Sequence, residues 1–277
     1  MLNNKPIGIF DSGYGGLTVF RSIIKQLPQY DYAYLGDTAR APYGNRSFSA
    51  IHQYTWECVQ QLFKMGCPLV ILACNTASAK ALRTIQQQNL KNEDPAKRVL
   101  GVIRPTAEVI GNYSKTNDIA VLGTKGTVQS GSYPIEIGHY FPDLNVHQQA
   151  CPLWVPLIEN GEYDNAGADY FIKEYLDKTM QQSPDIDTVL LACTHYPIIQ
   201  DKIEAYLPQN IKVIAQGDIV AASLADYLQR HPEMEQKLSK NATQEFFTTT
   251  DDTADFDTHA TMFFGAEVKS KFVSVTG

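Results

Sequence analysis

Two short stretches of the chain repeat one pattern, and this repeat limits the folds that the sequence can adopt. Residues 69–79 read LVILACNTASA, and residues 188–198 read TVLLACTHYPI. In each stretch an apolar run ends in Ala-Cys, a polar pair follows, and a segment that can be helical begins. This pattern predicts a strand, a turn and a helix. Because ligands of open α/β sheets gather where strands end, we expect Cys74 and Cys193 to lie at functional positions.

The repeat extends beyond the two cysteines. Ile7 and Ile119 lie in matching apolar runs that are 112 residues apart, and Pro42 and Pro156 lie in matching loops that are 114 residues apart. The cysteines themselves are 119 residues apart. The matching segments keep the same order, as expected of two related α/β halves that face one cleft. The tail from about residue 211 has no counterpart.

Strand-like runs alternate with helical stretches along the chain, which indicates largely parallel sheets. Further runs of this kind lie at 6–10, 31–35, 99–103, 119–122, 144–148, 187–191, 211–214 and 244–248. We therefore predict an α/β fold with two pseudo-symmetric domains, mostly parallel sheets and an active site in the cleft between them. The polar stretch 89–98 is a candidate linker and favours a domain boundary near residue 98.

Composition excludes several classes of protein. A formal net charge of −7 without Lys/Arg runs argues against a nucleic-acid surface. No apolar run is long enough for a membrane span, and the apolar stretch near the start is too short for a signal peptide. The five cysteines are an odd number and do not suggest a disulfide framework, so we expect free thiols and a cytoplasmic location.

Two thiols on opposite sides of one pocket suit the inversion of a carbon acid such as the α-carbon of an amino acid. One thiolate removes a proton from one side of the carbon, and the other thiol returns a proton to the opposite side. Hydrogen bonds to the substrate carboxylate must offset the low acidity of the α-hydrogen. The candidate donors near the cysteines are Ser12, Tyr43, Gly44, Asn75, Thr76, Thr194 and His195. Asp11 and His195 could move protons to and from the thiols.

Other interpretations stay open at this point. Asp11 and the polar residues after the cysteines could simply cap the following helices. Cys193 with His195 as base would suit a cysteine acyl transferase or amidase, which a covalent thioester would reveal. Cys74, Cys193 and His195 could also bind a metal, although the paired Cys-x-x-Cys spacing of zinc sites is missing. A phosphate-transfer site would need a second carboxylate two residues after Asp11, where the sequence has glycine. A pyridoxal enzyme would need a Schiff-base lysine, and the sequence context singles out no lysine for that role.

Several motifs, in this order, resemble those of the glutamate racemase family. They are DSGYGG, PYGNRS, ACNTAS, CPLWVPLIENGE, ACTHYP and the tail FFTTTDD with FFG. The resemblance runs nearly end to end, and these motifs together are specific. It implies an isomerase that needs no cofactor and no metal, uses two bases, and makes D-glutamate for peptidoglycan and cell-wall biogenesis, hence cell shape. Aspartate is the alternative substrate within the same superfamily.

The resemblance also implies roles for individual residues. The catalytic residues would be Cys74, Cys193, Asp11, His195 and Glu159, with Asp11 assisting the first thiol and Glu159 and His195 the second. The substrate-binding residues would be Asp11, Ser12, Tyr43, Gly44, Asn75, Thr76, Thr124, Thr194 and His195. The tail would return to the first domain, giving residues 1–98 with 214–277 and residues 99–213 as the two domains. We expect a homodimer that acts on the small molecule glutamate and has no nucleic-acid or membrane partner.

Overall fold

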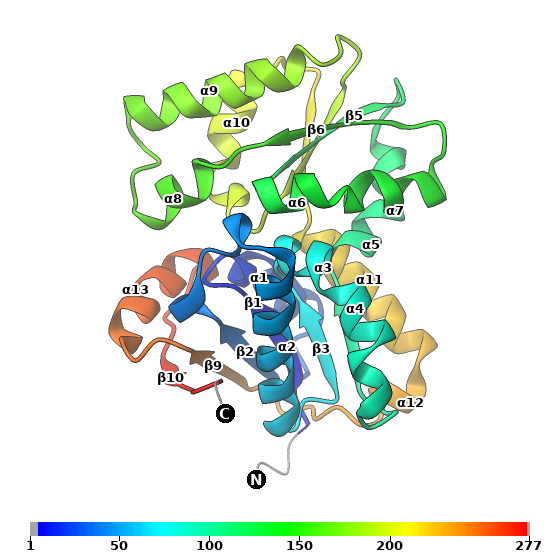
Figure 1. The fold of residues 1–277 in the computed structure, drawn as a ribbon, viewed down its shortest axis with the longest axis vertical. Coiled ribbons are helices and arrows are strands. Elements are labelled where there is room, and N and C mark those ends of the chain that lie inside the picture. The colour runs from blue at the N-terminus through cyan, green and yellow to red at the C-terminus, as the bar shows by residue number, and fades with distance from the viewer. Residues whose placement is uncertain (1–4, 276–277) are drawn as a thin grey trace. The chain divides into compact units, whose positions relative to one another are not determined.

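The chain forms an α/β structure built on two separate parallel sheets (Figure 1). The computed structural model describes residues 5–275, without the side chain of Asn92. The chain divides into two compact units: one runs up to Val102 and resumes at Gly217, and the other spans Ile103–Gln216. Within residues 5–275, no helix is both long enough and apolar enough to cross a membrane.

The first unit contains a sheet of six parallel strands in the order β10-β9-β2-β1-β3-β4. Its strands are β1 (Ile7–Asp11), β2 (Tyr32–Gly36), β3 (Leu69–Leu72), β4 (Arg98–Gly101), β9 (Gln244–Thr248) and β10 (Ser270–Phe272). Its α-helices are α1 (Gly16–Gln26), α2 (Phe48–Lys64), α3 (Asn75–Lys80), α4 (Leu82–Gln87), α11 (Gly217–Arg230), α12 (Pro232–Glu235) and α13 (Thr253–Phe264). The short 3-10 helices are η1 (Thr38–Arg40), η2 (Tyr43–Asn45) and η3 (Asn89–Asn92).

The second unit contains a sheet of four parallel strands in the order β6-β5-β7-β8. Its strands are β5 (Asp118–Gly123), β6 (Asn145–Ala150), β7 (Thr188–Ala192) and β8 (Lys212–Ala215). Its helices are α5 (Ile103–Ala107), η4 (Ile110–Tyr113), α6 (Lys125–Ser130), α7 (Ser132–Tyr140), α8 (Trp154–Glu159), α9 (Ala166–Met180), η5 (Tyr196–Ile199) and α10 (Gln200–Tyr206). The order matches that of β2-β1-β3-β4 in the first sheet, so the sequence repeat corresponds to a repeated strand order.

Helices cover both faces of the first sheet because side chains alternate along each strand. Phe10 and Leu72 join the apolar core beneath α2, whereas Tyr32 and Tyr34 contact Phe20 of α1 on the other face. Helices α11 and α13 pack beside α1 on that second face. Strands buried on both faces read as continuous apolar runs, which explains why they stand out in the sequence.

The polar stretch 89–98 does not end the first unit. Residues 89–92 form η3, and β4 then pairs with β3 in the first sheet, from Leu69 opposite Arg98 to Leu72 opposite Gly101. The unit boundaries lie after Val102 and before Gly217, whereas the sequence favoured residues 98 and 214. Strand pairing accounts for the shift, because β4 belongs to the first sheet and β8 to the second.

A buried carboxylate holds the C-terminal segment at the amino ends of β2 and β9. Asp31 accepts hydrogen bonds from the backbone N–H groups of Asn241 (3.0 Å) and Thr243 (2.9 Å), and from both of their side chains at 2.6 and 2.7 Å. Burial alone would raise the pKa of the Asp31 carboxyl, but hydrogen bonds from the segment 239–243 lower it to about 2. The ionised carboxylate therefore stabilises the folded chain.

We expect Asp31→Asn to lower the free energy of unfolding by roughly 2 kcal/mol near neutral pH, because charge-assisted hydrogen bonds to a buried group are lost. Since the folded pKa lies below the ordinary value, this stabilisation is present above about pH 4 and is lost as the pH falls toward 2. Urea titrations at about pH 7 and about pH 3 measure the difference, which should shrink at the lower pH. The exposed change Asp251→Asn is the control and should cost under about 0.5 kcal/mol. Equal losses at both pH values would contradict the prediction.

Candidate active site

Three neighbouring strands of the first unit end beside polar or nucleophilic residues. Asp11 is the last residue of β1, Asp37 follows β2, and Cys74 lies two residues beyond β3. Because β2, β1 and β3 are adjacent and parallel, these residues lie together at the carboxyl ends of the strands. Open α/β sheets bind ligands at the carboxyl ends of their strands.

The thiol of Cys74 has two hydrogen-bonding partners in the first unit. Cys74 occupies the N-cap position of α3, and its sulfur accepts from the backbone N–H of Ala77 at 3.4 Å. The hydroxyl of Ser12 lies 3.5 Å from the same sulfur. Cys74 is 5% exposed, so these contacts lie where water is largely excluded. A sulfur that accepts from a backbone N–H at a helix N-terminus is better suited to carry negative charge than an isolated buried thiol.

Asp11 lies in the turn that leads from β1 to α1. Its Oδ2 accepts from the backbone N–H of Gly13 at 2.9 Å, and its backbone oxygen accepts from Asp37 N at 3.0 Å. Helix α1 begins at Gly16 with Gly15 at its N-cap, so the interpretation of Asp11 as the cap of this helix is wrong. A Cβ on Gly16 would lie 2.5 Å from the Cβ of Asp11, which explains why glycine is needed where the helix approaches this carboxylate.

The remaining predicted residues of the first unit surround this edge. Asn75 and Thr76 are buried in the first turn of α3, directly after Cys74. Tyr43 and Gly44 lie in η2, which packs against α3. The structure therefore brings Asp11, Ser12, the η2 residues and the start of α3 to one end of the sheet.

The second thiol belongs to a chain of three interacting groups. Cys193 directly follows β7, is 5% exposed, and has its sulfur 3.9 Å from Nδ1 of His195. Nε2 of His195 lies 2.9 Å from Oε1 of Glu159, the last residue of α8. Trp154, at the start of α8, packs edge-on against Tyr196 at 4.8 Å between ring centroids. This contact fixes α8 against the segment that carries His195.

The environment of His195 favours its charged form. Burial would lower the pKa of the ring, but hydrogen bonds to Cys193 and Glu159, together with the charges of these groups, raise it from 6.5 to about 10. The protonated ring can donate from Nδ1 to the sulfur and from Nε2 to the carboxylate. His195 is thus placed to supply a proton to Cys193 or to stabilise its thiolate.

Two further predicted residues lie at strand ends of the second unit. Thr124 follows β5 and caps α6, with its Oγ1 accepting from Thr127 N at 3.2 Å. Thr194 is buried between Cys193 and His195. No three His, Cys, Asp or Glu side chains among residues 5–275 are grouped so that they could hold a metal ion. All five cysteines are free and buried.

The sequence motifs assigned no functional role to Asp37 and Arg40. Asp37 accepts from the hydroxyl of Tyr43 and from Nε of Arg40, the latter at 2.8 Å. A usable signal was present, since Asp37 follows β2 as Asp11 ends β1 and Cys74 follows β3. Cys58 on α2 also contacts Arg40, with its sulfur 3.3 Å from a guanidinium nitrogen.

Comparisons with known proteins agree with one another. The family model described as Asp/Glu/Hydantoin racemase matches residues 7–224. A glutamate racemase of Roseobacter denitrificans is 38% identical over 273 residues, which cover 95% of this chain and 98% of the relative. The crystal structure of glutamate racemase isoform RacE1 from Bacillus anthracis has a TM-score of 0.87 at 33% identity, covering 98% of this chain and 97% of that chain. Glutamate racemase from Francisella tularensis in complex with D-glutamate has a TM-score of 0.86 at 31% identity, covering 99% of both chains. These matches confirm the resemblance drawn from the sequence motifs and the α/β fold class.

The contact between Glu159 and His195 generates a prediction about protonation. In the parent chain the His195 ring should titrate with a pKa of about 10, and in Glu159→Gln it should titrate at lower pH, because one of the groups that raise the pKa is gone. Since the pKa is raised, the charged ring stabilises the fold below its ordinary pKa, and this stabilisation is lost as the pH rises through about 10. NMR of labelled histidine rings measures the titration, with His195→Asn to assign the signal.

The matched control for this titration is Glu162→Gln, three residues further along the chain. Glu162 is exposed and accepts from the side chain of Asn165 at 2.8 Å, so its loss should leave the His195 titration unchanged. A His195 ring that is already neutral at about pH 7 in the parent chain would contradict the assignment.

Proposed function

Because the chain belongs to the Asp/Glu/Hydantoin racemase family, we propose that it interconverts L-glutamate and D-glutamate with two cysteines as acid and base. Family membership makes the chain an isomerase. The observation that carries the proposal is the presence of Cys74 and Cys193 at equivalent strand ends of two units with matching strand order. Each sulfur has its own hydrogen-bonding partners, as an acid or base requires.

In the proposed reaction one thiolate takes the α-proton of glutamate, and the electron pair of the broken C–H bond remains on the α-carbon. The other thiol then donates its proton to the opposite side of that carbon, and its S–H electron pair becomes the thiolate. One turnover therefore exchanges the protonation states of the two cysteines. The residues proposed to bind the substrate supply donors for its carboxylate, which lowers the barrier to proton removal. The reaction needs neither a metal nor a cofactor.

We propose separate supporting roles for the groups beside each thiol. Asp11, in the turn beside Ser12, assists proton transfer at Cys74. His195 and Glu159 assist at Cys193, where the charged imidazole is hydrogen-bonded to both partners. Substrate contacts are proposed for Asp11, Ser12, Tyr43, Gly44, Asn75, Thr76, Thr124, Thr194 and His195. D-glutamate made in this way would supply peptidoglycan synthesis, and the five free thiols suit the reducing cytoplasm. The expected homodimer stays a prediction, which sedimentation of the purified chain tests.

The Cys193, His195 and Glu159 chain also resembles the nucleophile, base and orienting group of a thiol hydrolase. That function gives Cys74 no role, although its sulfur, like that of Cys193, has hydrogen-bonding partners. A covalent thioester, sought by mass spectrometry after incubation with amide or ester substrates, would favour the hydrolase. Its absence together with exchange of the α-hydrogen would favour the racemase.

The two-base mechanism predicts one-sided exchange in single-cysteine variants. The parent chain should exchange the α-hydrogen of both glutamate enantiomers with heavy water without added cofactor. Cys74→Ala and Cys193→Ala should each abolish racemisation, because one proton donor is lost, while the remaining thiol can still remove and return a proton on one side. By family resemblance Cys74→Ala should exchange only L-glutamate and Cys193→Ala only D-glutamate. NMR of the α-hydrogen measures the exchange.

Cys67→Ala is the matched control for these variants, because this thiol is buried at the opposite end of β3 from Cys74. It should retain racemisation. No exchange by the parent chain would overturn the proposed function. A single-cysteine variant that racemises near the parent rate would overturn the pairing of the two thiols.

Substrate choice gives a further prediction. Glutamate should turn over at least about tenfold faster than aspartate, because the relatives that match this chain nearly end to end are glutamate racemases. A missing methylene shifts the fit of the distal carboxylate, and a tenfold difference corresponds to about 1.4 kcal/mol. Circular dichroism of each amino acid measures the rates. Comparable rates would instead identify a racemase of broad specificity.

A further inference from the structure

The loop between β2 and α2 carries two of the residues proposed to contact substrate. Tyr43 and Gly44 lie in η2, which packs against α3, the helix that Cys74 caps. Tyr43 is 1% exposed and shares one apolar core cluster with Cys74. The loop therefore lies beside the first thiol and carries two of the proposed substrate contacts.

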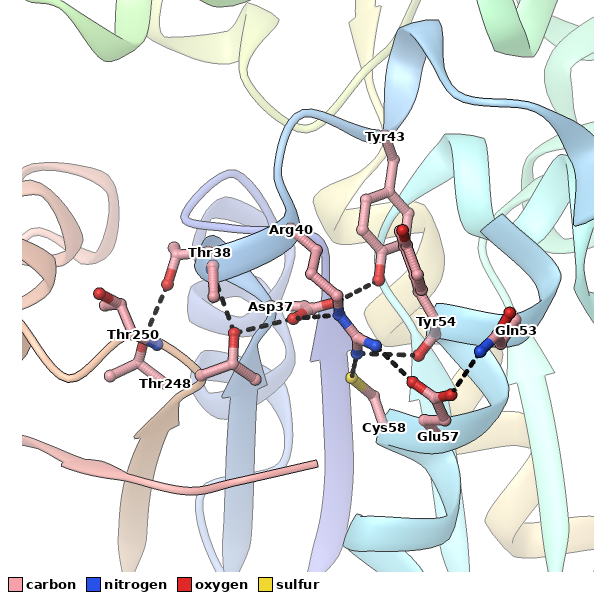
Figure 2. A network of polar contacts seen from close by, with 12 residues as sticks. Asp37, Thr38, Arg40, Tyr43, Gln53, Tyr54, Glu57, Cys58, Thr248 and Thr250 are labelled. Atoms are coloured by element: carbon pink, nitrogen blue, oxygen red, sulfur yellow. Dashed lines mark hydrogen bonds and ion pairs between the residues drawn. The ribbon is translucent and has the colours of Figure 1, made fainter. Parts of the chain in front are cut away.

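A buried carboxylate fixes the Tyr43 side chain. The Tyr43 hydroxyl donates to Oδ2 of Asp37, and Asp37 is fully buried. Arg40 donates from Nε to both carboxylate oxygens, at 2.8 and 3.1 Å, and the Thr249 hydroxyl donates to Oδ1 at 2.8 Å. Figure 2 shows Asp37 between Tyr43 and Arg40 in this network. One carboxylate thus joins the loop, the guanidinium and the segment after β9.

Arg40 is anchored in turn by helix α2. Its guanidinium forms an ion pair with Glu57 and lies over the ring of Tyr54, at 4.4 Å from Cζ to the centroid. It also lies 3.4 Å from the Tyr54 carbonyl oxygen and 3.3 Å from the Cys58 sulfur (Figure 2). Arg40 therefore cannot move without breaking contacts to three residues that lie within about one turn on one face of α2.

The segment that follows β9 holds the other side of the loop. The hydroxyls of Thr38 and Thr248 are 2.7 Å apart, and Ala39 N donates to the Thr249 hydroxyl at 3.1 Å. Together with the Arg40 contacts, these bonds tie the loop to α2, the next α-helix along the chain, and to the segment after β9, which is 210 residues away. A loop that only needed to be stable could use apolar contacts, since burying charges is costly even when they are paired. The polar network instead fixes one geometry of the loop.

We propose that Asp37 is a positioning residue for substrate binding, which through Tyr43 and Arg40 holds the backbone of residues 43–44 where it receives the substrate. This inference rests on the proposed function. Asp37 and Arg40 act through the loop and do not touch the reacting atoms. Because both enantiomers use the same loop, the effect applies equally to both directions of the reaction.

Removing the hydroxyl of Tyr43 tests this role with the least change in shape. Tyr43→Phe should raise KM for both enantiomers by roughly 3- to 10-fold, the effect of one lost hydrogen bond, and leave kcat within about twofold. Binding is weakened because the loop is no longer fixed, whereas the two thiols remain in place. A coupled racemisation assay followed in each direction separates KM from kcat.

The Asp37→Asn variant and a double variant test whether Tyr43 acts through Asp37. Asp37→Asn should raise KM at least as much as Tyr43→Phe. Adding Tyr43→Phe to Asp37→Asn should raise KM by much less than it does in the parent chain, because the shared interaction is already gone. If Asp37→Asn fails to fold, Thr249→Val, which removes another donor to the same carboxylate, takes its place.

Asp31→Asn is the matched control, since Asp31 is a buried carboxylate at the other end of β2 that also binds the C-terminal segment. It should lower stability and leave KM unchanged. If Tyr43→Phe and Asp37→Asn lower stability without changing KM, or lower kcat alone, the network is only structural and the proposal is overturned. A parent chain that does not racemise glutamate overturns the proposed function instead, a result that the parent assay reports separately.

Discussion

The parallel pairing of β9 with β2 is the constraint on which the first unit depends. The register runs from Tyr32 opposite Gln244 to Gly36 opposite Thr248, and each end is secured by a buried carboxylate. At the amino end Asp31 binds the segment 239–243, and at the carboxyl end Asp37 binds Thr249. A slip of one residue would reverse the two faces of β9 and break both sets of bonds. The C-terminal tail is therefore part of the framework that holds the loop beside Cys74.

Much of the fold could be predicted because its signals are local. Strands buried on both faces are short apolar runs, and two series of them occur in the same order, which corresponds to the shared order β2-β1-β3-β4 and β6-β5-β7-β8. Strand β10 escaped prediction, since SKF carries no apolar run and is defined only by its pairing with β9. The insertion of β9 beside β2 also has no local signal. The pairing of β9 with β2 depends on contacts between segments that are more than two hundred residues apart.

The residues of the candidate site likewise differ in whether a local sequence signal reveals them. Residues next to the cysteines could be found because strand ends are recognisable in sequence, and the structure brings Ser12 and Cys74 within 3.5 Å. Glu159 was assigned by resemblance alone, since it lies 36 residues before His195 and meets it only through the packing of α8. Arg40 was missed because its partners come from α2 and from Asp37, a combination that no spacing along the chain reveals.

The two thiols have related positions in the fold but different chemical environments. The sulfur of Cys74 accepts from a backbone N–H and lies beside the Ser12 hydroxyl. The sulfur of Cys193 lies beside an imidazole whose pKa is raised to about 10, so a positive charge accompanies it near neutral pH. In the proposed reaction free L- and D-glutamate have equal energies, so any difference between the two directions comes from the protein. The repeated strand order gives the two thiols equivalent positions, and the unrepeated residues around them give each thiol different hydrogen-bonding partners.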